Sequence, residues 1–155
     1  MSTERQIWRF AHREVCTLDA RANWPYIWPM TKPDTSLVTG VSHFALKVSD
    51  LDASVAWYTD ALRLEEFIRE PTGRFVGMRS ASGFEIALFT GGQPGNSGAL
   101  DHIALAVTDL DTLTSWVDHL TVIGVPHDGI KPSPRGQSVD LFDPDGNNIE
   151  LISEA

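Results

Sequence analysis

Cysteine, positive charge and long apolar runs are all scarce in this chain of 155 residues. Cys16 is its one cysteine, so an internal disulfide is excluded and we expect a protein of the reducing cytoplasm. Lysine and arginine number 12 against 21 aspartates and glutamates, which gives a formal net charge of −9. That balance argues against nucleic acids and membranes as partners, because nucleic acids and anionic membranes both attract a basic surface.

The sequence also has no recognisable targeting or membrane-spanning segment. No apolar run approaches the roughly 20 residues that a membrane-spanning helix needs, and residues 1–6 are polar, with no signal-peptide pattern. Hydrophobic residues make up 42% of the chain and charged residues 21%, which is typical of a soluble globular protein with a substantial core.

The most informative feature that is present is a duplication. The pattern His-apolar-Ala-Leu-x-Val-Ser/Thr-Asp-Leu-Asp occurs at residues 43–52 and again, 59 positions later, at residues 102–111. Each copy later reaches a short apolar run with one acid, Glu85 in the first copy and Glu150 in the second. The chain therefore holds two modules, and we predict a pseudo-twofold axis at which one His and one Glu from each module converge.

The first module predicts the element order β-α-β-β-β. Residues 43–48 are typical of a strand, and Ser49 or Asp50 can cap the helix that follows. Apolar residues then recur with the spacing of one helix face: Leu51, Val55, Tyr58 and Leu62. Three further strands, separated by good turn sequences, are expected at residues 64–69, 75–80 and 84–90.

The second module predicts the same order. Residues 102–107 form its first strand, and Thr108 or Asp109 caps its helix. The apolar face of this helix is Leu110, Leu113, Val117 and Leu120. Later strands are expected near Ile130 and at residues 138–142 and 148–153.

We divide the chain into an N-terminal arm, residues 1–39, and one domain, residues 40–155, with modules at about 40–91 and 99–155. The arm holds three of the five tryptophans: Trp8, Trp24 and Trp28. This is more apolar surface than a free tail carries, so we expect the arm to pack on the body or on a partner subunit. A disordered extension is the alternative. Glycine-rich residues 91–98 predict a flexible linker.

A histidine on the first strand and a glutamate on the last, in both copies, predict a metal site. A single such His is usually a packed residue, and a Glu within an apolar strand points either to solvent or to a face where it needs a cation. The coincidence in both modules favours joint ligation by His43, Glu85, His102 and Glu150. The other histidines, His12, His119 and His127, are interpreted as surface or turn residues.

These features resemble the vicinal oxygen chelate superfamily, which includes glyoxalase I, methylmalonyl-CoA epimerase, extradiol dioxygenases and the bleomycin or fosfomycin resistance proteins. The resemblance covers about residues 40–153 and rests on the two His-containing strands, the helix motif at 57–62 and the segment at 143–151. It implies an α+β fold in which two tandem βαβββ modules curl their mixed sheets around a central metal. In the glyoxalase I branch the four ligands correspond to His43, Glu85, His102 and Glu150.

Two positions depart from the glutathione-using glyoxalases. Lys47 stands where those of bacteria have an arginine, and Phe89 stands where they have an asparagine that contacts glutathione. The loss of that polar contact argues against glutathione and for a more apolar small-molecule substrate.

A mixed set of imidazoles and carboxylates suits a divalent first-row ion such as Zn, Ni, Co, Mn or Fe. The resemblance therefore implies a metal-dependent enzyme that chelates a small substrate through adjacent oxygens and catalyses proton transfer, as a lyase, isomerase or epimerase does. Glu150 is the first candidate for the proton acceptor, and Glu85 is the second.

Two other functions remain open at this stage. An Fe(II)-dependent extradiol-type dioxygenase typically uses two His and one carboxylate, so a fourth ligand counts against it. A metal-free binding protein for a small drug usually lacks the ligand set. We expect a homodimer, and the resemblance allows a site that closes within one chain or one that is shared across the dimer.

Overall fold

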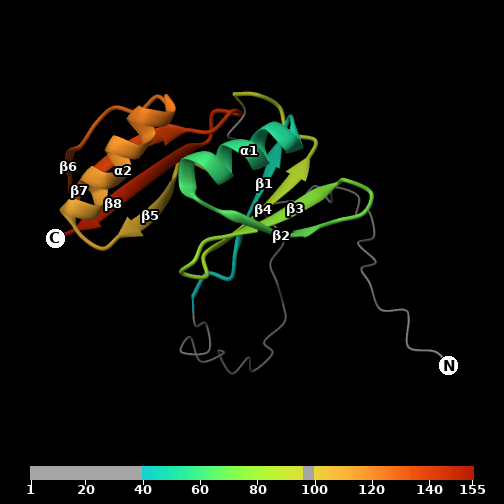
Figure 1. Ribbon diagram of the computed structural model, residues 1–155, viewed down its shortest axis with the longest axis horizontal. Helices are drawn as coiled ribbons and strands as arrows, with labels where there is room; N and C mark the ends of the chain where they lie inside the picture. The colour runs from blue at the N-terminus through green and yellow to red at the C-terminus, as the bar shows by residue number, and fades with distance from the viewer. Residues whose placement is uncertain (1–39, 96–99) are drawn as a thin grey trace, which may run out of the picture. The chain divides into compact units, whose positions relative to one another are not determined.

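The computed structural model describes residues 40–95 and 100–155, which form two βαβββ modules (Figure 1). Module one contains β1 (Phe44–Val48), α1 (Leu51–Leu62), β2 (Glu65–Arg69), β3 (Phe75–Arg79) and β4 (Glu85–Thr90). Module two contains β5 (Ile103–Val107), α2 (Leu110–Ile123), β6 (Lys131–Ser133), β7 (Gly136–Phe142) and β8 (Asn148–Glu154). The predicted α+β fold with tandem modules is confirmed. The arm, with its three tryptophans and His12, lies outside the described residues.

Each module forms its own four-stranded mixed sheet. The strand orders are β1-β4-β3-β2 and β5-β8-β7-β6, so the two sheets have the same topology. The pairs β1 with β4 and β5 with β8 are parallel, and the remaining pairs are antiparallel. β1 and β5 are thus edge strands of their sheets, and the two repeated histidines stand directly before them.

Both helices begin at an aspartate, as the sequence predicted. The Asp50 carboxylate accepts a hydrogen bond from the Ala53 backbone N–H at 3.0 Å, and the Asp109 carboxylate accepts one from the Thr112 N–H at 2.8 Å. Such caps satisfy backbone donors that have no partner within the helix. The same hydrogen bond from Thr112 lowers the pKa of Asp109. Neither helix, nor any other in the described ranges, is long and apolar enough to cross a membrane.

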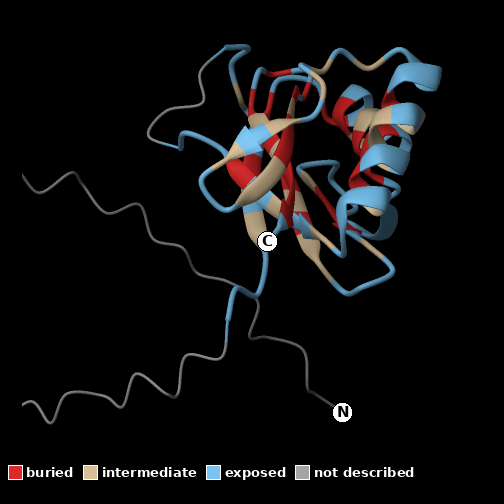
Figure 2. Ribbon diagram, turned by 90° about the vertical axis from the view of Figure 1, so that its left-hand side faces the viewer, coloured by how far each residue is buried: buried red, intermediate tan, exposed pale blue. Residues whose placement is uncertain are grey.

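The core lies between each helix and one face of its sheet, where buried residues gather (Figure 2). Strand alternation sends every second side chain to this face. The side chains with almost no exposure include Val48, Tyr58, Val76, Met78, Leu88, Leu113, Leu120, Val139, Leu141 and Ile149. One prediction of the helix face is wrong, because Leu110 at the start of α2 is 48% exposed. The opposite face of each sheet is left uncovered by its helix.

The loop at residues 143–147 joins the two modules through buried acids. The Tyr58 hydroxyl on α1 donates to the Asp143 carboxylate at 2.9 Å, and the Ser49 backbone N–H donates to the Asp145 carboxylate at 3.0 Å. Burial, and then the charge of Asp143, raise the pKa of Tyr58 far above its ordinary value. This loop, which lies between the predicted strands at 138–142 and 148–153, therefore also fastens module two to module one.

The first half of the predicted linker is hydrogen-bonded to both modules. The Gly92 N–H donates to the Val48 carbonyl at 3.0 Å, and the Gly95 N–H donates to the Asp145 carbonyl at 2.7 Å. A Cβ at Gly92 would lie 2.5 Å from the Lys47 carbonyl oxygen, so the close approach requires glycine. Residues 96–99 of the linker lie outside the described residues.

Candidate metal centre

The predicted ligands lie on the open faces of the two sheets. In module one, Phe44 is opposite Ile86 across the β1–β4 pair, and both side chains face the helix. His43 and Glu85, one residue earlier on each strand, therefore share the opposite, open face. In module two, Glu150 is opposite Ala104, and His102 shares this face because it is two residues before Ala104.

Module two brings its predicted pair together. The His102 Nε2 lies 3.6 Å from a Glu150 carboxylate oxygen, and the His102 Nδ1 lies 2.9 Å from the Asp101 carboxylate. The hydrogen bond to Asp101, followed by the charges of Glu150 and Asp140, raises the pKa of His102. A carboxylate that holds one ring nitrogen of a histidine is the arrangement that orients the other nitrogen toward a metal ion. The structure therefore brings His102 and Glu150 together on one open face, with Asp101 on the other ring nitrogen of the histidine.

Module one does not pair its histidine and glutamate in this way. One carboxylate oxygen of Glu85 accepts a hydrogen bond from the Arg79 Nε at 2.8 Å and forms an ion pair with the Arg79 Nη2 at 2.6 Å. Arg79 also lies 4.3 Å from the centre of the Phe67 ring. The His43 Nδ1 lies 3.2 Å from the Ser42 hydroxyl, and no ion pair between His43 and Glu85 is formed in this described part of the chain.

The register shows that the two glutamates are not equivalent. In module one, the residue directly opposite His43 is Glu85. In module two, the residue directly opposite His102 is Asn148, and Glu150 lies two residues after it. The residue of module one that matches Glu150 is Ala87. The prediction that the two glutamates occupy matched positions is therefore wrong. The sequence also indicated this mismatch. Ile149-Glu150-Leu151 aligns with Ile86-Ala87-Leu88, which places Glu150 at the position of Ala87.

The four predicted ligands do not form one cluster within a single chain. Across residues 40–95 and 100–155, no three His, Cys, Asp or Glu side chains are placed to hold a metal ion together. The contacts that join the modules involve α1, α2 and the 143–147 loop instead. Joint ligation by the four residues stays a prediction, and in this chain only the pair His102–Glu150 is assembled.

The two open faces differ in character. That of module one is rich in aromatic residues: Phe75 and Phe89 stack with ring centroids 5.2 Å apart, and Phe67 is 45% exposed. Lys47 is directly opposite Phe89, so the two departures from the glutathione-using pattern are neighbours. The face of module two is charged instead.

On that second face, Lys131 forms ion pairs with Asp128 and Asp140. Asp140 is opposite Glu150 across the β7–β8 pair, so this charged network lies beside the His102–Glu150 pair. Lys131 lowers the pKa of Asp128 through a hydrogen bond, although burial acts in the opposite direction.

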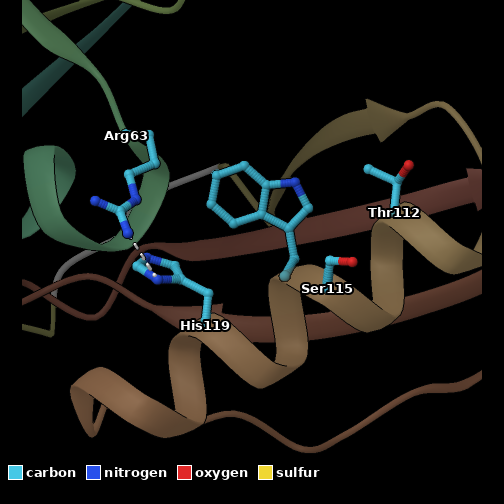
Figure 3. A pocket seen from close by; sticks show the side chains of 5 residues that line it. Arg63, Thr112, Ser115 and His119 are labelled. Atoms are coloured by element: carbon cyan, nitrogen blue, oxygen red, sulfur yellow. Dashed lines mark hydrogen bonds between the residues drawn. The ribbon is translucent and has the colours of Figure 1, made fainter.

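Two histidines that the sequence assigned to the surface make specific contacts. The His127 Nε2 lies 3.0 Å from the Thr121 hydroxyl, and the Gly129 N–H donates to its Nδ1 at 3.2 Å. His119 on α2 contacts the end of α1 and lines a cavity of about 250 Å³ (Figure 3). None of the four predicted ligands lines this cavity, whose residues are Arg63, Thr112, Ser115, Trp116 and His119.

Comparison with known proteins gives one family and a set of similar solved structures. Residues 40–151 match the profile of the glyoxalase/bleomycin resistance protein/dioxygenase superfamily. A glyoxylase/bleomycin resistance protein/dioxygenase domain from Frankia sp. EAN1pec is 28% identical, with a TM-score of 0.68, and the match covers 76% of this chain and 99% of that one.

Two further structures are similar. A lactoylglutathione lyase from Agrobacterium tumefaciens is 25% identical, with a TM-score of 0.60, over 77% of this chain and 94% of that one. A variant of the fosfomycin resistance protein FosX from Listeria monocytogenes is 21% identical, with a TM-score of 0.63, over 76% and 94%. That FosX structure contains Mn(II) and a dihydroxypropylphosphonic acid.

Proposed function

The chain belongs to the glyoxalase/bleomycin resistance protein/dioxygenase superfamily, and we propose that it is a metal-dependent enzyme whose metal is held by His43, His102 and Glu150. The observation that carries this proposal is the His102–Glu150 pair at 3.6 Å, with Asp101 on the other ring nitrogen of the histidine. Two imidazoles and one carboxylate suit a divalent first-row ion and leave positions open for substrate oxygens. The Mn(II) in the FosX structure supports a divalent ion in this fold.

Glu85 has a different role in this proposal. It stands opposite His43 rather than at the position that matches Glu150, and Arg79 holds one of its oxygens. The second oxygen makes no ion pair or hydrogen bond with the described residues, so it is available to receive a proton. We therefore propose that Glu85 is the proton acceptor and that Glu150, the first candidate from sequence, serves as a ligand.

The third ligand, His43, is supplied by a second copy of the chain. Within one chain, the described residues gather no three of the candidate donors. The strands that follow His43 and His102, β1 and β5, are edge strands, and an exposed edge favours pairing with another strand. A twofold dimer that brings β1 of one copy toward β5 of the other would complete two equivalent sites.

The proposed reaction is proton transfer on a small substrate with two adjacent oxygens. A bound divalent ion supplies Lewis-acid stabilisation of negative charge on those oxygens. Glu85 removes the proton from the neighbouring carbon, and Arg79 keeps its carboxylate in position. Phe75 and Phe89 on the same open face support a substrate with an apolar part.

A second candidate function follows from the same ligand set. Two His and one carboxylate with open positions are also typical of Fe(II) enzymes that activate oxygen. A fourth ligand would count against this function, and in the present proposal Glu85 is a base and not a ligand. In such an enzyme the aromatic open face of module one would hold a catechol-like ring.

The experiment that tests the proposal starts with metal analysis of the full chain purified without added metal. We expect one divalent ion per chain, and the loaded protein is then assayed with α-hydroxy-ketones, thiohemiacetals, acyl-CoA esters and catechols. Proton transfer predicts exchange of the substrate proton with solvent and no oxygen uptake.

The outcomes separate the two candidates. Iron as the bound metal, together with oxygen consumption on a catechol, would replace the proton-transfer enzyme with the dioxygenase. Failure to bind Zn, Ni, Co, Mn or Fe at stoichiometric levels would contradict both, and would leave a small-molecule binding protein.

A further inference from the structure

A cavity of about 250 Å³ lies on the helix side of the molecule, between the end of α1 and the outer face of α2. Figure 3 shows Arg63 directly above His119, with Ser115 and Thr112 farther along α2; Trp116 is the fifth residue that lines the cavity. The cavity contains no predicted metal ligand, and nothing in the proposed reaction uses its residues. It is a cavity open to solvent, lined by one cation, one large aromatic side chain, one histidine and two hydroxyl side chains.

Arg63 is a cation that lacks a carboxylate partner among the described residues. Most lysines and arginines of residues 40–95 and 100–155 form ion pairs: Arg69, Arg74, Arg79, Lys131 and Arg135. Arg63 instead donates to the His119 Nδ1 at 3.1 Å. A guanidinium has five N–H donors, so most of those on Arg63 remain available to a ligand. The positive charge of Arg63 is therefore not balanced by a carboxylate within the described residues, and an anion could balance it.

His119 fixes the position of this guanidinium. Its Nε2 lies 2.7 Å from the Asp60 backbone carbonyl, which can only accept, so the Nε2 carries the hydrogen. Its Nδ1 is then the acceptor for Arg63, and both contacts are satisfied by one neutral tautomer. Trp116 supports the ring from the side, in an edge-to-face arrangement with centroids 5.8 Å apart. The arginine is therefore oriented before any ligand arrives.

Trp116 supplies the apolar part of the site. It packs partly against the core, and the rest of its ring lines the cavity beside Arg63. Pockets for drug-sized ligands range from about 300 to 1,000 Å³, so a cavity of 250 Å³ suits a ligand with a single ring. Planar rings stack on indole, and carboxylates match the fork of a guanidinium.

We propose that this cavity binds a small aromatic carboxylate, with its ring against Trp116 and its carboxylate on Arg63. Arg63 follows α1 in module one, and Trp116 belongs to α2 in module two, so the ligand contacts both modules. The site is separate from the proposed metal centre, and neither proposal depends on the other.

Titration calorimetry of the full chain with benzoate tests this inference, with benzyl alcohol and acetate as the matched probes. Benzoate should bind with a Kd of about 0.1–10 mM, the range expected for so small a ligand. Benzyl alcohol keeps the ring without the charge, and acetate keeps the charge without the ring. Both should bind at least about tenfold more weakly than benzoate, because each lacks one half of the recognition.

Variants then assign the binding to these residues. R63Q removes the cation from an exposed position, and W116L removes the indole surface; each should weaken benzoate binding about tenfold or more. W57L is the matched control, because Trp57 is the equivalent residue of α1 and does not line the cavity. Benzoate binding that is absent, equal to that of benzyl alcohol, or unchanged in R63Q would overturn the inference. If W116L is too unstable to assay, the R63Q comparison decides alone.

Discussion

The two modules share one backbone plan but differ on their open faces, and the clearest difference is the surroundings of their glutamates. Glu150 is opposite Asp140 and lies 3.6 Å from His102. Glu85 is opposite Arg79, which holds it through a hydrogen bond and an ion pair. The first arrangement leaves a carboxylate beside an imidazole, without a lysine or arginine partner within the described residues. The second neutralises the carboxylate within its own module.

This comparison shows which features a duplication preserves. Both modules keep the aspartate that caps the helix and the apolar strand residues that face it, because each module needs them to fold. Folding does not fix the residues of the open faces in the same way. The open face of module one is aromatic, and that of module two is charged. The backbone plan and the helix caps are therefore shared by the two modules, and the side chains of the open faces are not.

The largest expected effect comes from exchanging each glutamate for glutamine. E150Q should lose at least about 100-fold in metal affinity, because even residues behind a ligand contribute 10–100-fold. E85Q should keep its metal near the wild-type level but lose about 100-fold in activity, the usual scale for a lost general base. Metal content by mass spectrometry and turnover of the identified substrate measure the two effects. Equal metal loss in both variants would restore Glu85 as a ligand.

A smaller effect is expected where the modules meet. Y58F removes the hydroxyl that donates to the buried Asp143, so the free energy of unfolding should fall by about 1–3 kcal/mol. Val117 is the matching residue of α2 and has no hydroxyl, so this contact belongs to one module only. Urea unfolding measures the change, and the exposed T59A variant is the control. An unchanged unfolding free energy would show that the loop does not depend on Tyr58.

The match between Ala87 and Glu150 can be tested by adding a carboxylate at position 87. A87E places a carboxylate at the position that matches Glu150, and metal affinity should rise about tenfold because an additional anionic ligand becomes available. A87Q has nearly the same shape without the charge and should leave the affinity unchanged. A rise in both variants, or in neither, would contradict the assignment of Ala87 as the matching position.

The smallest effect concerns the helix interiors. Ser54 of α1 is fully buried and its hydroxyl has no partner within the described residues, whereas the matching residue of α2 is the buried Leu113. S54A should therefore leave the stability unchanged or raise it by up to about 1 kcal/mol, since a buried polar group without a partner is costly. Thermal unfolding checks this, and a clear loss of stability would show that the hydroxyl has a partner after all.

Much of the fold could be predicted because local patterns carry it. Asp50 and Asp109 mark the helix starts, and alternating apolar residues mark the strands. The register could not be predicted, since the segments between each helix and the next strand differ in length, residues 63–64 in module one and 124–130 in module two, and the sequence alone does not show which residues pair. His119 was missed for a similar reason: its partners, Arg63 and Asp60, lie 56 and 59 residues away.

The most direct test of the central claim is to mix two inactive variants, H43A and H102A. Each alone should lose its metal, because every site in its dimer lacks one ligand. If His43 comes from one copy and His102 from the other, a mixed dimer contains one intact site and one site that lacks both histidines. Unfolding and refolding the two variants together should therefore restore metal binding. If binding returns only in refolded wild-type protein and never in the mixture, the site is not shared between copies and the account is wrong.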